Sequence, residues 1–471
     1  MSGSGSPALP AGYDEDRDDS GAPREGYGAA FAALGGADLE QLRRDVAQQL
    51  RRRGVIFGGE PFAVDPVPRL IAAAEWDPLA RGLAQRARAL NRLLLDAYGE
   101  RAIVQAGVLP AAAIEQAAGY EAELLGRLPG FGSPAAIIGF DVVRAPDGEF
   151  MVLEDNLRTP SGFAYALAAR QVLLDVLPAG LPGPRAVDPL AYELLARALR
   201  AAAPPGCGDP SIVVVSDGPD NTAYYEHAQA AERLGATLAT LDDLAGEVDG
   251  LRVRRPDGST QPVDVVYRRT NEDQLRDDDG EPTAVARLLL DPWLRGRIGL
   301  VNAFGNGVGD DKFVHGRVED CIRFYLAEQP LVRSVPTKTV TPATGRRPSI
   351  DALRRHVIKP RHGYGGGGVV IGAHAEEDDL ERLADELEAD PERFIAQPIV
   401  PLSRHPTVID GRLEPRRVDL RAFAFVSGGE DGDVAVLPGG LTRVALGADA
   451  LVVSSSQNGG GKDTWVLDAA P

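Results

Sequence analysis

Two side chains of the segment "VLEDNLRTPSG", residues 152–162, could hold a metal ion together. Glu154 and Asn156 stand two residues apart, directly after an apolar run. Residues i and i+2 of an extended strand point to the same side, so the carboxylate and the amide should face one spot. Mg²⁺ prefers oxygen ligands of this kind. On its own, the pattern is equally compatible with a solvated acidic edge of a hairpin.

A third oxygen-bearing side chain, Asp141, lies on the strand that precedes this segment. The run "AAIIGFDVVRAPDGEFMVLEDN" predicts a hairpin whose turn, "APDG", contains Pro, Asp and Gly. A two-residue turn would place Asp141 opposite Met151 or Val152. In the second register, Asp141 joins Glu154 and Asn156 on one face. These three residues are therefore candidate metal ligands.

The segment "VIKPRHGYGGGGVVIG" predicts a phosphate-binding lid. A strand ends at Lys359, a glycine-rich loop spans 363–368, and a second strand begins at Val369. Glycines tolerate positive φ and lack Cβ, so backbone N–H groups can close over phosphate oxygens. The lysine precedes the glycines, unlike in a Walker A motif, and a strand follows the loop, unlike in a Rossmann fingerprint. The alternative is an ordinary flexible hairpin.

The strand "RRVDLRAFAFV" places Arg417, Asp419 and Arg421 on one face and apolar residues on the other. Two arginines on one face could stabilise the charge of a transferring phosphoryl group. A surface strand with an Arg–Asp pair explains the pattern equally well.

The elements around these motifs indicate an α/β protein with α+β lobes. Helical patterns span about 38–53 and 77–99. After a composition shift near 201–211, a βαβ pattern predicts an open, mostly parallel sheet. From residue 356 onward, strands and loops alternate. We divide the chain into a mostly disordered N-terminus (1–25), a helical segment with the hairpin (26–205), an α/β domain (206–345) and a lobe with the glycine-rich loop (346–471).

Composition narrows the possible functions. The net charge of −19 argues against non-specific binding of nucleic acid, although an anion site needs only a few local donors. Cys207 and Cys321 match no metal-ligand spacing, the six histidines form no metal-binding pair, and we predict no zinc site. The N-terminus lacks the apolar run of a signal peptide, and no later stretch is long and apolar enough to span a membrane. We therefore expect a cytoplasmic protein with reduced thiols.

Taken together, the motifs resemble the ATP-grasp superfamily, specifically its circularly permuted members, such as glutathionylspermidine synthase-like ligases. Ordinary members place their E-x-N hairpin last, whereas here "EDN" precedes the glycine-rich loop. From about residue 27 to 467, the chain is similar to a large, poorly characterised bacterial group of permuted ATP-grasp proteins. The matching segments are "VLEDNLRTPSG", "NAFGNGVGDDK", "KPRHGYGGGG", "GGLTRVAL" and "SSQNGGGKDTWVL".

This resemblance implies an ATP-grasp fold in circularly permuted order, with a Rossmann-like pre-ATP-grasp domain over 206–345. It also implies an ATP-dependent carboxylate–amine ligase that uses Mg²⁺ or Mn²⁺ and forms an amide through an acyl phosphate, releasing ADP and phosphate. Gln397 would meet the adenine, and Asn458 would lie on the acceptor side. The implied residues are Arg421 and Arg443 for catalysis; Lys312, Lys359, Gly363, Tyr364, Gly365, Gly366, Gly367, Gly368, Gln397 and Asn458 for nucleotide binding; and Asp141, Glu154 and Asn156 for the metal.

The expected substrates are ATP, a small carboxylate and an amine, such as an amino acid or a peptide. Family context adds an α-helical partner protein, while nucleic acid and membranes are not expected partners. Two alternatives stay open: a non-catalytic nucleotide-binding scaffold, and a small-molecule kinase on the same fold.

Hydrogen exchange across residues 361–369 is expected to slow when ATP and Mg²⁺ are added. The physical reason is that four consecutive glycines have no side chains to pack, so phosphate contacts would protect their N–H groups. Exchange followed by mass spectrometry measures the effect. Unchanged exchange here, with protection elsewhere in the protein, would contradict a phosphate lid.

Overall fold

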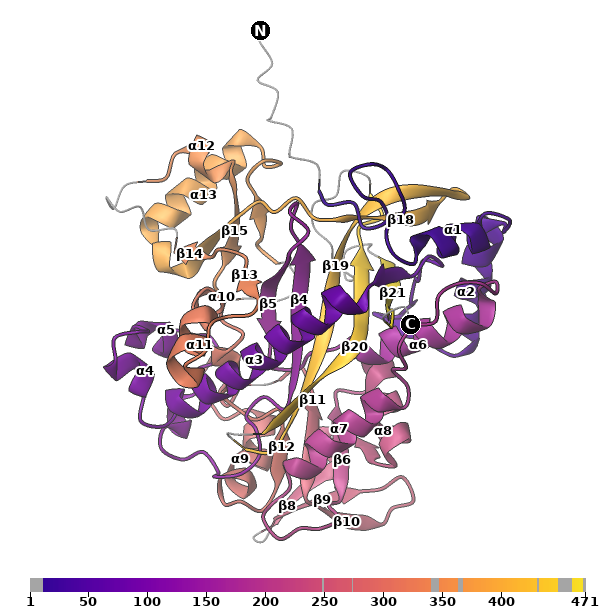
Figure 1. Cartoon of the computed structure of the whole chain (residues 1–471). Helices are drawn as coiled ribbons and strands as arrows, with labels where there is room; N and C mark the ends of the chain where they lie inside the picture. The colour runs from indigo at the N-terminus through magenta and orange to yellow at the C-terminus, as the bar shows by residue number, and fades with distance from the viewer. Residues whose placement is uncertain are drawn as a thin grey trace.

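A mixed eight-stranded sheet forms the centre of the molecule (Figure 1). The computed structural model describes residues 12–247, 250–272, 274–339, 347–362, 367–429, 432–447 and 460–468. The strand order is β13-β5-β4-β19-β20-β21-β3, and β18 pairs with β19 outside this path. The bounds are β3 (Arg69–Ile71), β4 (Ile137–Arg144), β5 (Phe150–Asn156), β13 (Arg333–Ser334), β18 (Arg404–Ile409), β19 (Arg412–Ser427), β20 (Asp433–Val444) and β21 (Gly460–Val466).

Helices cover both faces of this sheet, which explains why its strands are apolar on both sides. Phe140 and Leu420 pack with α3 (Ala73–Ala97), which crosses one face in Figure 1. Ile137 and Phe423 pack on the other face with α6 (Phe163–Val176) and α7 (Leu190–Ala201). Polar side chains on these strands therefore either line the part of the sheet that the helices leave uncovered or pair with a helix residue, as Asp155 does with Arg86 of α3.

The hairpin β4–β5 differs from its predicted register. Asp141 lies directly opposite Glu154, and a bulge follows, because Val142 pairs with Val152. The predicted two-residue turn is also wrong, because the loop is longer and is closed by a hydrogen bond from Ala145 N–H to the carbonyl of Glu149. The bulge inserts one extra residue into β5, so Asp141 and Glu154 still share one face.

A parallel four-stranded sheet, in the order β12-β11-β6-β7, forms the second unit and confirms the predicted βαβ pattern. The side-chain amide of Asn302 joins it to the central sheet, because it accepts from Ile137 N–H (2.9 Å) and donates to Ile137 carbonyl (2.7 Å). The bounds are β6 (Ile212–Ser216), α8 (Tyr224–Leu234), β7 (Thr237–Ala239), β11 (Val265–Arg269), α9 (Ala284–Leu294), β12 (Gly299–Val301), and an antiparallel β8 (Leu244–Glu247), β9 (Gly250–Arg254) and β10 (Thr260–Val263).

A small lobe with its own core carries the glycine-rich segment (Figure 1). Its sheet has the order β14-β17-β15-β16. Gly368 has φ +71°, and a Cβ there would lie 2.8 Å from Cγ of Pro360, so this position favours glycine. Residues 363–366 of the predicted lid lie outside the described part of the chain. The bounds are β14 (Lys338–Thr339), α12 (Ile350–Leu353), β15 (His356–Pro360), β16 (Val370–Ile371), α13 (Glu377–Ala389) and β17 (Phe394–Pro398).

The N-terminal segment differs from the predicted disorder of residues 1–25 where it is described. Glu15 is buried and forms ion pairs with Arg69 and Arg144, so residues near it are packed against the body of the protein. In the described ranges, no helix has the length and apolar character needed to cross a membrane. The remaining elements are α1 (Tyr27–Leu34), α2 (Leu39–Arg52), β1 (Ile56–Phe57), β2 (Glu60–Pro61), α4 (Ala102–Gln105), α5 (Ala111–Glu115), α10 (Lys312–His315) and α11 (Val318–Leu326).

Candidate active site

A cavity of about 600 Å³ lies between the small lobe and the central sheet. Of the predicted loop residues that the structure describes, Gly367 and Gly368 lie outside its lining. Gly363, Tyr364, Gly365, Gly366 and Asn458 fall outside the described residues. The predicted site residues that line the cavity are Asp141, Glu154, Asn156, Lys312, Lys359, Gln397, Arg421 and Arg443.

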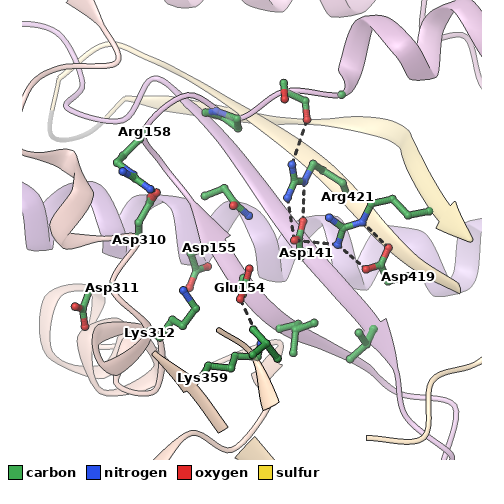
Figure 2. A pocket seen from close by; sticks show the side chains of 18 of the residues that line it. Asp141, Glu154, Asp155, Arg158, Asp310, Asp311, Lys312, Lys359, Asp419 and Arg421 are labelled. Atoms are coloured by element: carbon green, nitrogen blue, oxygen red, sulfur yellow. Dashed lines mark hydrogen bonds and ion pairs between the residues drawn. The ribbon is translucent and has the colours of Figure 1, made fainter. Parts of the chain in front are cut away.

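One end of the cavity brings two lysines to one carboxylate (Figure 2). Lys359, on β15, lies with Nζ 3.2 Å from Oε1 of Glu154 on β5. Lys312 opens α10, whose N-cap Asp311 accepts from two backbone N–H groups. Burial disfavours the charge of Glu154, but the charges of Lys359 and Lys312 outweigh it and lower its pKa. Asp310 and Asp311 also line this end but pair with Arg158 and Arg361, so the two lysines outnumber the one carboxylate of Glu154 and make this end attractive to phosphate.

Arginines and aspartates alternate across three neighbouring strands at the next part of the cavity. Arg421 on β19 donates from Nε and Nη2 to the two oxygens of Asp141 on β4, at 2.7 and 2.9 Å. Arg443 on β20 reaches the same carboxylate at 3.0 Å and donates from Nε to Asp419 at 2.8 Å. Burial opposes the charge of Asp141, but the two arginines outweigh it and hold its pKa well below the usual range.

These contacts orient both guanidinium groups toward the cavity that they line. A guanidinium carries five N–H donors, so donors of Arg421 and Arg443 remain for an anion in the cavity. The arrangement can therefore stabilise charge that develops on a bound group.

Glu154 and Asn156 fit a magnesium site that a nucleotide would complete. Both line the cavity, and Asn156 is oriented by a bond from Nδ2 to the carbonyl of Gly139 at 3.3 Å. The described residues contain no group of three or more His, Cys, Asp or Glu side chains suited to a metal. Mg²⁺ commonly takes one or two carboxylates and completes its shell with water and phosphate. Asp141 differs, because Arg421 engages both of its oxygens; its metal role stays a prediction.

Sequence reasoning missed the residue between these two, Asp155. It points to the opposite face of β5, where Arg86 of α3 donates to its two oxygens at 2.6 and 2.7 Å. Nδ1 of His315, in the α10 turn that begins at Lys312, lies 2.7 Å from the same carboxylate. Burial opposes the charge of Asp155, but Arg86 outweighs it and lowers the pKa to about 2. A charged residue on the buried face of an alternating strand was the available signal.

A second missed contact joins the two lysine-bearing elements. Arg361, two residues after Lys359, donates from Nε to Asp311 at 2.7 Å and from Nη2 to the carbonyl of Ala113 at 2.7 Å. Both Arg361 and Asp311 are buried. This ion pair therefore fixes the end of β15 against the start of α10.

Gln397 offers an unsatisfied acceptor at the lobe side of the cavity. Its Nε2 donates to Oγ1 of Thr337 at 2.9 Å, while its buried Oε1 has no hydrogen-bond partner among the described residues. A buried acceptor without a partner costs free energy until a ligand donates to it. An amino group of a bound base could supply that donor.

The sequence model of the family described as "Circularly permuted ATP-grasp type 2" matches residues 68–445. The chain belongs to this circularly permuted ATP-grasp family. It is 42% identical, over 97% of its length, to a Frankia alni protein named "Putative glutamate--cysteine ligase 2-3", of which it covers 54%. It is 40% identical to an uncharacterized protein of Mycobacterium tuberculosis, covering 97% of this chain and 84% of that protein. The chain thus spans about half the length of the Frankia relative.

A glutathione synthetase-like effector from Globodera pallida resembles the permuted ATP-grasp chain in structure, with a TM-score of 0.55. The identity is 13%, and the match covers 91% of this chain and 97% of the other. At this identity the likeness shows the fold alone. The predicted α/β fold in circularly permuted ATP-grasp order is thereby confirmed.

Replacing Asp155 with Asn is expected to lower the free energy of unfolding by about 3–5 kcal/mol, because buried Arg86 loses its charged partner. Denaturant unfolding followed by circular dichroism measures this loss. The matched control is Asp147→Asn on the same hairpin, whose exposed pair with Arg333 should contribute less than about 1 kcal/mol. Equal losses in the two variants would contradict the assignment.

The same pair predicts a pH dependence. The pKa of Asp155, about 2, lies below its ordinary value of 3.8, so the folded state favours the ionised form. The stabilisation is therefore complete above about pH 4 and is lost as the pH falls toward 2. The stability gap between wild type and Asp155→Asn should shrink across that window.

Proposed function

We propose that the protein is an ATP-dependent carboxylate–amine ligase that forms an amide through an acyl phosphate. The observation that carries the proposal is one cavity in which Lys312, Lys359 and Glu154 lie beside Arg421 and Arg443. Family membership and the ligase name of the Frankia relative support it.

The lysine end suits the nucleotide phosphates. Lys359 would exchange its contact with Glu154 for a phosphate, and Lys312 would add a second cation. Glu154 and Asn156 would hold Mg²⁺, which supplies charge neutralisation to the phosphate oxygens. Oε1 of Gln397 would accept a hydrogen bond from the adenine amino group, which removes its unsatisfied state.

The arginine end suits the acyl phosphate. A carboxylate oxygen of the acid attacks the γ-phosphorus, the bond to the bridging oxygen breaks, and ADP leaves. The amine nitrogen then attacks the acyl carbon, phosphate leaves, and the amine loses a proton. Arg421 and Arg443, fixed by Asp141 and Asp419, offer donors to the charge that accumulates on the transferred group.

ATP is expected to raise the melting temperature only when Mg²⁺ or Mn²⁺ is present. Without the ion, only Lys312 and Lys359 would offset the repulsion between the phosphates and the carboxylate of Glu154, and binding of a ligand to the folded state alone is what raises stability. Thermal unfolding with ATP in Mg²⁺ or in EDTA measures the effect. An equal shift in EDTA would count against the metal assignment.

Turnover separates the ligase from its alternatives. Glu154→Gln and Lys359→Met each remove one charge with little change in size, and each should reduce ADP formation at least a hundredfold. A lost charge-stabilising group commonly costs about 3–4 kcal/mol in the transition state. Released ADP, measured with pools of amino acids and peptides, gives the rate, and mass spectrometry identifies the product.

The matched controls are Glu149→Gln and Lys338→Met, whose side chains are exposed and lie outside the cavity lining. Both should retain wild-type rates. A stable phosphorylated product without an amine would indicate a kinase, and nucleotide binding without ADP release from any acid and amine would indicate a scaffold. Activity that survives both site substitutions would reject the proposed roles.

A further inference from the structure

The cavity continues past the arginines into an aromatic wall. Three aromatic side chains line it: Phe57 of β1, Phe62, which follows β2, and Tyr165 of α6. The ring centroids of Phe62 and Tyr165 are 5.0 Å apart, and those of Phe57 and Tyr165 are 5.5 Å apart at nearly right angles. Tyr165 donates its hydroxyl to the carbonyl of Ile56 at 2.9 Å, so its polar group is already satisfied. We define Phe57, Phe62, Tyr165 and Leu441 as the aromatic wall.

The wall begins directly beside Arg421, as the space around two glycines shows. A Cβ on Gly162 would lie 3.4 Å from Cδ2 of Leu441 and 3.7 Å from Cδ of Arg421. A Cβ on Gly461 would lie 3.2 Å from Cδ1 of Leu441 and 2.8 Å from Cζ of Phe62. Arg421, Leu441 and Phe62 are thus consecutive neighbours. A ligand that reaches Arg421 with one end can contact the wall with the other.

The buried carboxylate behind the aromatic wall, Glu226, is already neutralised by an arginine. Glu226 is buried and pairs with Arg269 at 3.1 Å. It also accepts from the backbone N–H groups of Gly162 and Ala164, at 2.9 and 3.0 Å. The lysine end, by contrast, collects its cations around Glu154. Among the described residues, the wall offers no unpaired cation, so a second carboxylate placed on it would lose hydration without gaining a partner, which is unfavourable.

We infer that the acid substrate carries an aromatic or large aliphatic group seated on the aromatic wall, with its carboxylate directed to Arg421. This inference rests on the proposed ligase function and adds the class of acid. Phe57, the half-buried member of the wall, offers apolar surface and a ring to that group, the other three residues hold Phe57 in place from the core, and Arg421 supplies a charged donor. Specificity would then come from the group next to the carboxylate.

The test compares two carboxylic acids that differ at the end away from the shared carboxylate: one ends in a phenyl ring and the other in a second carboxylate. The full chain, with Mg²⁺ and the non-hydrolysable analogue AMP-PNP, is titrated with 3-phenylpropanoate and with glutarate by calorimetry. The structure predicts that 3-phenylpropanoate binds at least tenfold more tightly. Phe57→Ala should weaken that binding at least tenfold, and Phe57→Leu should weaken it less. The matched control is Phe31→Ala, which truncates another half-buried phenylalanine outside the cavity lining.

The outcomes distinguish the inferred class of acid from the proposed ligase function. Glutarate that binds as tightly as 3-phenylpropanoate, no detectable binding of 3-phenylpropanoate, or equal effects of Phe57→Ala and Phe31→Ala would overturn the inference. Turnover is followed separately, by trapping acyl phosphate with hydroxylamine from L-phenylalanine or L-glutamate. Hydroxamate from glutamate alone would overturn the inference and leave the ligase standing. The expected binding pattern without ADP release from any acid would support the wall and reject the ligase.

Discussion

The bidentate ion pair between Asp141 and Arg421 is the interaction on which the geometry of the site depends. It joins residues 280 positions apart in sequence, on the adjacent strands β4 and β19. Arg443 extends it through a shared contact with Asp141 and its own pair with Asp419. Two half-buried arginines side by side would repel each other without these carboxylates, so the aspartates make the arginine pair possible. The alternation of charge across β4, β19 and β20 fixes where each guanidinium points.

Two ion pairs of different strength connect the small lobe to the rest of the site. Lys359 meets the partly exposed Glu154 at 3.2 Å, whereas Arg361 is buried with Asp311 and also donates to backbone. Breaking a buried pair costs far more than breaking an exposed one, so a ligand in the cavity can replace the first contact while the second persists. The end of β15 is therefore anchored at Arg361, and the cation two residues before it stays available to a ligand. Asp155 anchors the other side, because it ties β5 to α3 and to the α10 turn through Arg86 and His315.

Alternation and motif spacing were sufficient to predict the cavity-lining residues Glu154, Asn156 and Arg421, because strand geometry decides which side chains share a face. The pairing register was not predictable from the same pattern. The bulge after Asp141 depends on the loop that closes the hairpin and on packing against β19, both of which lie beyond local sequence. The partners of Asp155 and of Glu15 were missed for a related reason: each carboxylate is stabilised by arginines from distant segments. Sequence shows an acidic residue, but only tertiary structure shows whether it is solvated or paired.

Because the chain is circularly permuted, the two sets of site residues lie far apart in sequence and must be brought together during folding. The hairpin with Glu154 comes early in the chain, while the strands with Arg421 and Arg443 come late, and they meet only when β4 pairs with β19. Bringing these distant segments together costs chain entropy, and this cost is offset only after their contacts have formed. The ion pairs that orient the arginines span that same junction, so their geometry depends on the pairing of β4 with β19. Arg421 then lies between the lysine end and the aromatic wall because a single strand face presents it to both. One register between two distant segments therefore sets the distance from the lysine end to the aromatic wall.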